Sequence, residues 1–335
     1  MKNIGIVGYG YWGKNLVRNF KVLSSCEVKY VCEKDPDLAA KCKELYSAIK
    51  VVPDYETLLN DDALDGIVIA TPVDTHYAFA KLSLENGKHT LVEKPLTDSH
   101  EKAVELKQMA DDKGLILMVD HTFLYAGSVK YLKDNVDAGE YGNITYIDSI
   151  RINLGLFQHD VNVLWDLAPH DISIVYYLIG QKPKSIQATG ISHTNNNIEN
   201  IAYLTLKYEN NLMVHFNCSW VSPVKIRQML IGGDKKMVMF NDMDPNEKIK
   251  IYDTGFKVRS NEEKKIFNAD YRVGDIYVPQ VPLTEALSLM AEDFINSIIN
   301  GIEPRSNSEL GVHVVEILEI AELSIKNKGQ EILLD

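Results

Sequence analysis

Short apolar runs alternate with amphipathic segments over the first 120 residues. The apolar runs predict strands at residues 2–7, 28–32, 66–70, 89–92 and 115–119, with a further short strand at 49–52. The segments between them predict helices at residues 14–23, 36–45, 76–85 and 99–113, and a helical turn at 55–59. The run GIVIA at 66–70 contains no polar residue, which is typical of a parallel strand buried on both faces. This alternation predicts a parallel, doubly wound α/β sheet.

The pattern changes after residue 121. A helix around residues 128–138 is followed by strand-like segments at 143–153, 184–193, 199–208, 211–219, 224–232 and 235–241, with one helix at about 166–179. Short polar turns, such as 209–211 and 232–234, join several of these strands and are typical of hairpins. Two more helices are predicted at about 283–300 and 309–327. The second part of the chain is therefore expected to be α+β, with one large, mostly antiparallel open sheet.

Two domains follow from these patterns: a nucleotide-binding α/β domain over residues 1–120 and an α+β domain over residues 121–335. A length of 335 residues agrees with two domains, because it exceeds what one ordinary core organises. The two C-terminal helices are expected to pack back near the junction between the domains.

The composition, with 45% apolar and 24% charged residues, is that of a globular protein in water. A net charge of −12 argues against a nucleic-acid partner and against an anionic membrane surface. The four cysteines form no C-x-x-C pair and lack zinc-site spacing, so we expect reduced, packed thiols and no metal site. The first residues lack the pattern of a signal peptide, and nowhere are 18 consecutive residues apolar. These features predict a cytoplasmic protein without a membrane span.

A glycine-rich turn provides the first functional motif. The first strand leads into Gly8, Tyr9, Gly10, Tyr11, Trp12 and Gly13, a G-x-G-x-x-G pattern that opens a helix. In this context the first glycine allows a tight turn, the second allows a pyrophosphate to approach the backbone, and the third allows the helix to pack closely on the strand. We therefore expect Gly8, Gly10, Tyr11, Trp12 and Gly13 to bind a dinucleotide cofactor.

The end of the second strand indicates which dinucleotide is bound. Glu33 lies 20 residues after Gly13, where a carboxylate accepts hydrogen bonds from the adenosine ribose hydroxyls and repels a 2′-phosphate. This favours NAD over NADP, although the neighbouring Lys34 weakens the inference. Asp35 is a competing carboxylate, but it precedes Pro36 and is expected to cap the next helix.

Three further candidate cofactor contacts follow the strand at 66–70. Thr71 and Pro72 stand at its carboxyl end, where open α/β sheets bind ligands, and are expected to line the cofactor channel. His76 is a weaker candidate, because it can equally be an ordinary residue near the start of a helix.

Two further motifs contain ionisable residues suited to catalysis. Glu93 and Lys94 follow another short strand, and Lys94 precedes Pro95, which restricts its backbone to an extended conformation. Asp166 and His170 are four residues apart, so on a helix they share one face. Pro169 is tolerated in the first turn of a helix, which predicts a helix start near Asp166.

Taken in order, the motifs GYGYWG, ATPVDTH, GKHTLVEKPLT and WDLAPHD resemble the glucose–fructose oxidoreductase/inositol dehydrogenase (Gfo/Idh/MocA) family. The resemblance covers nearly the whole chain, and E-K-P together with D-x-x-x-H is its specific part. It implies an N-terminal Rossmann domain that binds NAD, and a C-terminal domain whose open sheet forms a homodimer or homotetramer interface. It also implies that Lys94 is the active-site lysine, that Asp166 and His170 are the paired catalytic residues, and that Glu93 and Lys94 lie beside the cofactor.

The chemistry of alcohol oxidation agrees with these roles. Loss of a hydride from a carbinol carbon requires the hydroxyl proton to leave, and histidine is the side chain whose ordinary pKa lies nearest neutrality. Our hypothesis is that His170 is the base, that Asp166 orients it, and that Lys94 stabilises negative charge on the substrate oxygen. Lys94 as the base is the alternative.

Substrate contacts are expected from Tyr125, Arg151, Asn153 and Arg227, in addition to Asp166 and His170, and the loop at residues 158–160 points to the same region. The HTFLY and WDLAPHD stretches resemble family members that act on sugar nucleotides. That resemblance implies a UDP-N-acetylhexosamine 3-dehydrogenase, with inositol or free-sugar oxidation as the alternative. A non-catalytic protein that senses NAD(H) or serves as a scaffold is the alternative from a different class.

Overall fold

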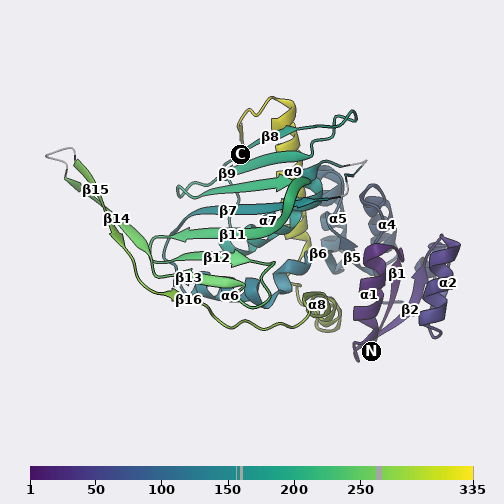
Figure 1. The fold of residues 1–335 in the computed structure, drawn as a ribbon. Coiled ribbons are helices and arrows are strands. Elements are labelled where there is room, and N and C mark those ends of the chain that lie inside the picture. Colours follow the sequence, from purple (N-terminus) through teal and green to yellow (C-terminus); the bar gives the residue numbers. More distant parts are fainter. Residues whose placement is uncertain (156, 159–160, 262–265, 335) are drawn as a thin grey trace. The chain divides into compact units, whose positions relative to one another are not determined.

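The computed structural model describes residues 1–155, 157–158, 161–261 and 266–334 (Figure 1). Its internal contacts divide the chain into two compact units. Unit 1 consists of Met1–Tyr125 and Thr284–Glu319, and unit 2 consists of Ala126–Leu283 and Ile320–Asp335. The long helix α9 (Ser308–Lys326) contributes residues to both units.

Unit 1 is built on a six-stranded sheet with the order β3-β2-β1-β4-β5-β6. All of its strand pairs are parallel, which confirms the predicted doubly wound sheet. The strands are β1 (Lys2–Val7), β2 (Cys26–Cys32), β3 (Lys50–Val52), β4 (Gly66–Ile69), β5 (His89–Glu93) and β6 (Leu117–Asp120). The connecting helices are α1 (Tyr11–Lys21), α2 (Pro36–Leu45), α3 (Glu56–Leu59), α4 (Val73–Glu85) and α5 (His100–Lys113). The strand order reverses between β1 and β4, where such sheets bind ligands.

A distant segment of the chain completes the core of unit 1. Helix α8 (Ala286–Asn300) packs against α1, where the Phe294 ring meets the Phe20 ring edge-on, 6.2 Å between centroids. The same helix lies so close to β4 that a Cβ on Gly66 would stand 3.4 Å from both Phe294 and Ile298. Residues 284–319 are therefore an integral part of the first core.

Unit 2 is built on a nine-stranded sheet with the order β16-β13-β12-β11-β7-β10-β9-β8-β17. Every pairing in it is antiparallel except that of β7 with β10, so the predicted, mostly antiparallel sheet is confirmed. Its strands are β7 (Ile144–Leu154), β8 (Ser185–Ile191), β9 (Ile201–Lys207), β10 (Met213–Ser219), β11 (Val221–Gly233), β12 (Met237–Asn241), β13 (Ile249–Tyr252), β16 (Ile276–Tyr277) and β17 (Ile332–Leu333). Strands β14 (Gly255–Asn261) and β15 (Ile266–Arg272) form a separate hairpin that extends away from this sheet (Figure 1).

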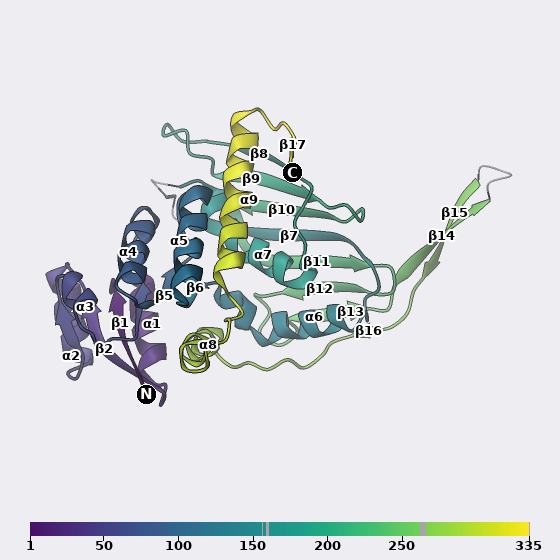
Figure 2. The same ribbon diagram turned by 180° about the vertical axis from the view of Figure 1, so that it is seen from behind.

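Helices cover only one face of the nine-stranded sheet. Helices α6 (Gly127–Asp137) and α7 (Val163–Ile179) lie behind the strands in Figure 1 and in front of them in Figure 2. Side chains alternate along the strands, so that β10 buries Val214, Phe216 and Cys218 on the covered face. The opposite face is covered by no element of the part of unit 2 that the structure describes.

Helix α7 begins earlier than the sequence pattern predicted. It starts at Val163, because the side chain of Asn162 accepts hydrogen bonds from the N–H groups of Leu164 and Trp165 and so caps the helix. The predicted start near Asp166 was therefore wrong, and Pro169 lies inside the helix rather than in its first turn. The helix tolerates this proline because only one N–H group is lost, while most of the apolar residues of α7 are buried.

A buried ion pair connects α7 to strand β7 of the sheet. The Arg151 guanidinium on β7 donates two hydrogen bonds to the Asp171 carboxylate on α7, at 2.9 and 2.6 Å. Both side chains are buried, with exposed fractions of 5% and 7%. The bidentate geometry pairs the two charges directly and fixes the rotation of α7 against β7.

Removing the Asp171 charge is expected to destabilise unit 2. Asp171→Asn removes the carboxylate that accepts both hydrogen bonds of the buried Arg151 guanidinium, which costs about 3–5 kcal/mol. Two of the three tryptophans, Trp165 and Trp220, belong to unit 2, so urea unfolding followed by tryptophan fluorescence measures the loss. The double variant Arg151→Met/Asp171→Leu removes both charges and is expected to recover most of the stability. A loss below about 1 kcal/mol in Asp171→Asn would show that water reaches the pair.

Candidate active site

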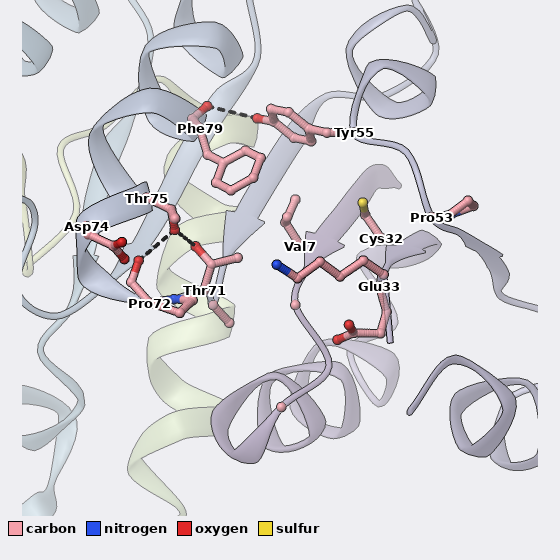
Figure 3. Close-up of a pocket in the computed structure, with 14 residues that line it drawn as sticks. Val7, Cys32, Glu33, Pro53, Tyr55, Thr71, Pro72, Asp74, Thr75 and Phe79 are labelled. Carbon is pink, nitrogen blue, oxygen red and sulfur yellow. Dashed lines mark hydrogen bonds between the residues drawn. The ribbon is translucent and has the colours of Figure 1, made fainter. Parts of the chain in front are cut away.

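A pocket of about 480 Å³ opens in unit 1 where the strand order of the sheet reverses (Figure 3). Its walls come from the carboxyl ends of β1, β2 and β4, from the start of α4, and from the segment that follows β3. The lining residues are Val7, Gly8, Gly10, Cys32, Glu33, Lys34, Pro53, Tyr55, Ala70, Thr71, Pro72, Asp74, Thr75 and Phe79. Five of the residues predicted to bind the cofactor, namely Gly8, Gly10, Glu33, Thr71 and Pro72, are among them.

The three glycines of the turn between β1 and α1 have different surroundings. Gly8 has φ of +91°, and a Cβ on it would stand 2.4 Å from the carbonyl oxygen of Ala70. A Cβ on Gly13 would stand 2.1 Å from the carbonyl oxygen of Gly8, so α1 packs directly on the end of β1. A Cβ on Gly10 would meet no atom within 4 Å. The fold itself therefore requires Gly8 and Gly13, whereas Gly10 leaves open space above the backbone.

The start of α1 faces this open space. Gly10 is the N-cap of the helix and no side chain caps its first turn, so the N–H groups at the helix start are available to an anion. Tyr11 and Trp12 follow directly, with 81% and 43% of their surfaces exposed, and their rings meet edge-on. This turn has the features of a pyrophosphate site.

Glu33 is held firmly at the end of β2. One carboxylate oxygen accepts a hydrogen bond of 2.6 Å from the N–H of Tyr9, and the other accepts one of 2.8 Å from the N–H of Asp35. Each carboxylate oxygen can accept a second hydrogen bond, so the side chain keeps acceptor sites for hydroxyl groups. Asp35 caps α2 through the N–H groups of Asp37 and Leu38, as predicted.

The residues after β4 shape the opposite wall of the pocket. The Thr75 hydroxyl lies 2.7 Å from the Thr71 hydroxyl and 2.6 Å from the carbonyl oxygen of Pro72, which closes the turn (Figure 3). His76 is 1% exposed, and its two ring nitrogens lie 2.9 Å from the Pro95 carbonyl oxygen and 2.8 Å from the Thr71 carbonyl oxygen. Burial lowers the pKa of His76. The imidazole thus connects the turn after β4 to the turn after β5, and its predicted contact with the cofactor stays a prediction.

Lys94 lies among buried ionisable groups at the ends of β5 and β6. It follows Glu93, and its peptide bond to Pro95 is cis. Burial and the Asp120 carboxylate raise the pKa of Glu93 well above its usual range. Burial also raises the pKa of Asp120 and, together with the Lys94 charge, lowers that of His121 to about 3. Asp120 was not predicted as a site residue, although a carboxylate at the end of the strand next to β5 was a usable signal.

In unit 2, Asp166 and His170 lie one turn apart on α7, as their spacing predicted. The indole N–H of Trp220 donates a hydrogen bond of 2.9 Å to the Asp166 carboxylate. Trp220 is 1% exposed and packs its ring against Phe157, so its position is fixed and it holds the carboxylate in place. The convergence of this pair with Lys94 of unit 1 stays a prediction.

The remaining predicted substrate residues make contacts within their own units. In unit 1, the Tyr125 hydroxyl donates to Asp293 at 2.6 Å, and the Arg305 guanidinium lies over its ring. In unit 2, Arg151 is bound to Asp171, Arg227 stands 3.6 Å from Asp242, and Asn153 is half-buried near the end of β7. Gln158 belongs to the described loop, whereas residues 159 and 160 lie outside the described residues.

Two further expectations concern metals and membranes. Among the described residues, no group of three or more His, Cys, Asp or Glu side chains is arranged to hold a metal ion. All four cysteines are free and buried. None of the helices that the structure describes is both long enough and apolar enough to cross a bilayer.

Comparisons with known proteins agree with this geometry. Residues 2–121 match the model of an oxidoreductase family with an NAD-binding Rossmann fold, and residues 129–239 match the model of the GFO/IDH/MocA C-terminal domain. UDP-N-acetylglucosamine 3-dehydrogenase from Acidithiobacillus ferrooxidans is 29% identical over 192 residues, which are 56% of this chain and 58% of that enzyme. The NADP(+)-dependent scyllo-inositol 2-dehydrogenase of Bacillus subtilis is 24% identical over 97% of this chain and 94% of its own length.

Solved structures share the complete fold. The UDP-N-acetylglucosamine 3-dehydrogenase from Acidithiobacillus ferrooxidans superposes with a TM-score of 0.79 at 21% identity, covering 97% of this chain and 98% of that one. Levoglucosan dehydrogenase, in complex with NADH and levoglucosan, superposes with a TM-score of 0.84 at 18% identity, covering 99% of both chains. At such low identities the likeness establishes the architecture of both units.

The surroundings of the three glycines generate a prediction. Gly10→Ala is expected to weaken NADH binding at least tenfold, about 1.4 kcal/mol, because the added Cβ occupies space left for a ligand. The thermal midpoint of the ligand-free protein is expected to change little. Titration of purified protein with NADH, followed by nucleotide fluorescence, measures the affinity. Gly13→Ala is the matched variant and should lower the thermal midpoint by several degrees. Equal NADH affinity in Gly10→Ala and the wild type would contradict a dinucleotide at this turn.

Proposed function

The chain belongs to the Gfo/Idh/MocA family of oxidoreductases, and from this premise we propose that it is an NAD-dependent dehydrogenase that oxidises a ring hydroxyl of a sugar or sugar nucleotide. The observation that carries the proposal is the pocket where the sheet order reverses, with open space at Gly10 and a fixed carboxylate at Glu33. The N–H groups at the start of α1 would hold the pyrophosphate of NAD, and Glu33 would accept hydrogen bonds from the adenosine ribose.

The proposed reaction converts a secondary alcohol to a ketone. The C–H bond releases a hydride and the O–H bond releases a proton, so that one acceptor is needed for each. NAD, when bound, supplies the hydride acceptor. His170 accepts the proton, and Asp166, held by the Trp220 indole, orients the imidazole and stabilises its charged form. The Lys94 ammonium donates a hydrogen bond to the substrate oxygen and stabilises its developing negative charge.

For the substrate we propose a UDP-linked N-acetylhexosamine, oxidised at C3. This rests on the HTFLY and WDLAPHD stretches and on the similarity to a UDP-N-acetylglucosamine 3-dehydrogenase. An inositol or free sugar is the second candidate, favoured by the scyllo-inositol 2-dehydrogenase that matches 97% of this chain. A cytoplasmic location is part of the same proposal, because nucleotide sugars and NAD are both found there.

The open face of the nine-stranded sheet is proposed as the contact between subunits of a homodimer or homotetramer. On this face Ile152 pairs with Ile226 across β7 and β11, whereas Ile150 pairs with Gln228 and Leu230 pairs with Asp148 in the neighbouring rows. Apolar and polar side chains mixed in this way on a sheet without covering helices are typical of an interface between subunits.

Assays with purified protein test the activity. With NAD and UDP-N-acetylglucosamine, absorbance near 340 nm is expected to rise in the wild type, whereas Lys94→Met is expected to reduce kcat at least tenfold and to leave NADH binding nearly unchanged. A rise in absorbance with inositol but not with the nucleotide sugar would reverse the order of the substrates. Tight NADH binding without turnover of either would favour a sensor.

Multi-angle light scattering after gel filtration tests the subunit contact. Wild-type protein is expected to have at least twice the 37.8 kDa mass of the chain. The double variant Ile150→Glu/Leu230→Glu puts charges in the centre of the face and is expected to shift the protein to monomer. Val104→Glu, at an exposed apolar residue of α5, is the control and should leave the mass unchanged. A monomeric wild type would contradict the proposal.

A further inference from the structure

Two carboxyl groups face each other at the ends of neighbouring strands. Glu93 closes β5 and Asp120 closes β6, and the parallel register places these two residues opposite each other. Their exposed fractions are only 7% and 3%. Two like charges in such a dry location repel each other strongly, so this arrangement needs an electrostatic explanation.

The surroundings of the pair supply few donors for two negative charges. One Glu93 oxygen accepts the N–H of Lys94 at 3.2 Å, and the other is buried without a donor among the described residues. Asp120 accepts from the Thr122 hydroxyl. Two ionised carboxylates only accept hydrogen bonds, whereas a protonated carboxyl group can donate to its neighbour. One proton held by the pair removes the repulsion between the two groups.

The cation that acts on this carboxyl pair is the ammonium group of Lys94. Its ammonium charge acts on Glu93, on Asp120, and on the imidazoles of His121 after β6 and His76 on α4. Burial lowers the pKa of both imidazoles, to about 3 for His121, which therefore supplies no positive charge near neutral pH. Asp74 on α4 is the other charged group acting on His76.

We propose that Glu93 and Asp120 share one proton, and that the single negative charge of the pair keeps Lys94 in its ammonium form. In this arrangement Glu93 and Asp120 are positioning residues that act through Lys94. A buried cluster with one negative and one positive charge is nearly neutral, whereas an isolated ammonium in a dry site loses its proton readily. The inference rests on the proposed dehydrogenase function, and it assigns Lys94 as a hydrogen-bond donor and leaves proton acceptance to His170.

A pH profile of kcat/KM distinguishes a shared proton from two independent charges. On this proposal the alkaline limb of the wild-type profile depends on the positive charge of Lys94. Either Glu93→Gln or Asp120→Asn leaves one carboxylate, which keeps the single negative charge, so the limb is expected to move by less than about 0.5 pH unit. The double variant Glu93→Gln/Asp120→Asn removes the charge and is expected to move the limb down by about one pH unit or more. The comparison uses the pH at which the alkaline limb lies in each profile. The maximum value of kcat/KM does not enter the comparison and is allowed to decrease in the variants.

Two outcomes would overturn the proposal. A single variant that moves the alkaline limb as far as the double variant does would show that the pair carries two independent charges. An unchanged limb in the double variant would show that the pair does not act on Lys94. NADH titration and a thermal melt of each variant establish that the site and the fold persist, so a merely structural effect is recognised.

Infrared spectroscopy tests the shared proton without turnover. The difference spectrum of wild type minus Glu93→Gln at neutral pH is expected to show the C=O stretch of a protonated carboxyl group, shifted in deuterated water. Absence of this band contradicts the shared proton whatever the activity. If the band is present but the protein oxidises no sugar, inositol or nucleotide sugar, the proposed function is contradicted. The shared proton of Glu93 and Asp120 is still supported in that case.

Discussion

The turn between β1 and α1 has no space for a side chain at Gly8 or Gly13, and the candidate cofactor site depends on this close packing. Because α1 starts directly on the end of β1, its first N–H groups lie at the point where the strand order reverses. The same turn supplies the Tyr9 N–H that fixes the Glu33 carboxylate. One backbone segment therefore determines both the anion-binding end and the ribose-binding wall of the pocket.

Buried carboxyl groups next in sequence to the predicted catalytic residues are a second feature of the molecule. Asp171 follows His170 and anchors α7 through Arg151, while Glu93 precedes Lys94 and faces Asp120. The cost of burying charge is lowered in a different way in each case. In the first, the Arg151 cation neutralises the Asp171 anion. In the second, Glu93 and Asp120 retain one proton, so that the two carboxyl groups carry a single negative charge. In both cases the backbone beside a predicted catalytic side chain is held by electrostatics rather than by packing alone.

Periodicity and turn chemistry were sufficient to predict much of this fold. The run GIVIA and its neighbours predicted the parallel sheet, and the polar turns at 209–211 and 232–234 predicted hairpins that the structure contains. The predictions were less accurate for features that depend on tertiary contacts. Strand β11 starts at Val221 because a bulge accommodates Pro223, which lacks an N–H, and local patterns do not reveal a bulge. The segment from β13 to β16 was not predicted at all.

Helix α8 returns to the first unit after more than 150 residues of the second, and this affects the order of assembly during synthesis. Phe294 and Ile298 cover β4, so a nascent chain that has emerged only as far as β6 has every strand of the parallel sheet but leaves part of its core exposed to water. The first unit is thus completed only after residues 126–283 of the second unit have been made. The nucleotide pocket, which lies in this unit, therefore forms late as well. A chain that ends before α8 would bind chaperones and be degraded by proteases, and it would not act as a smaller nucleotide-binding protein.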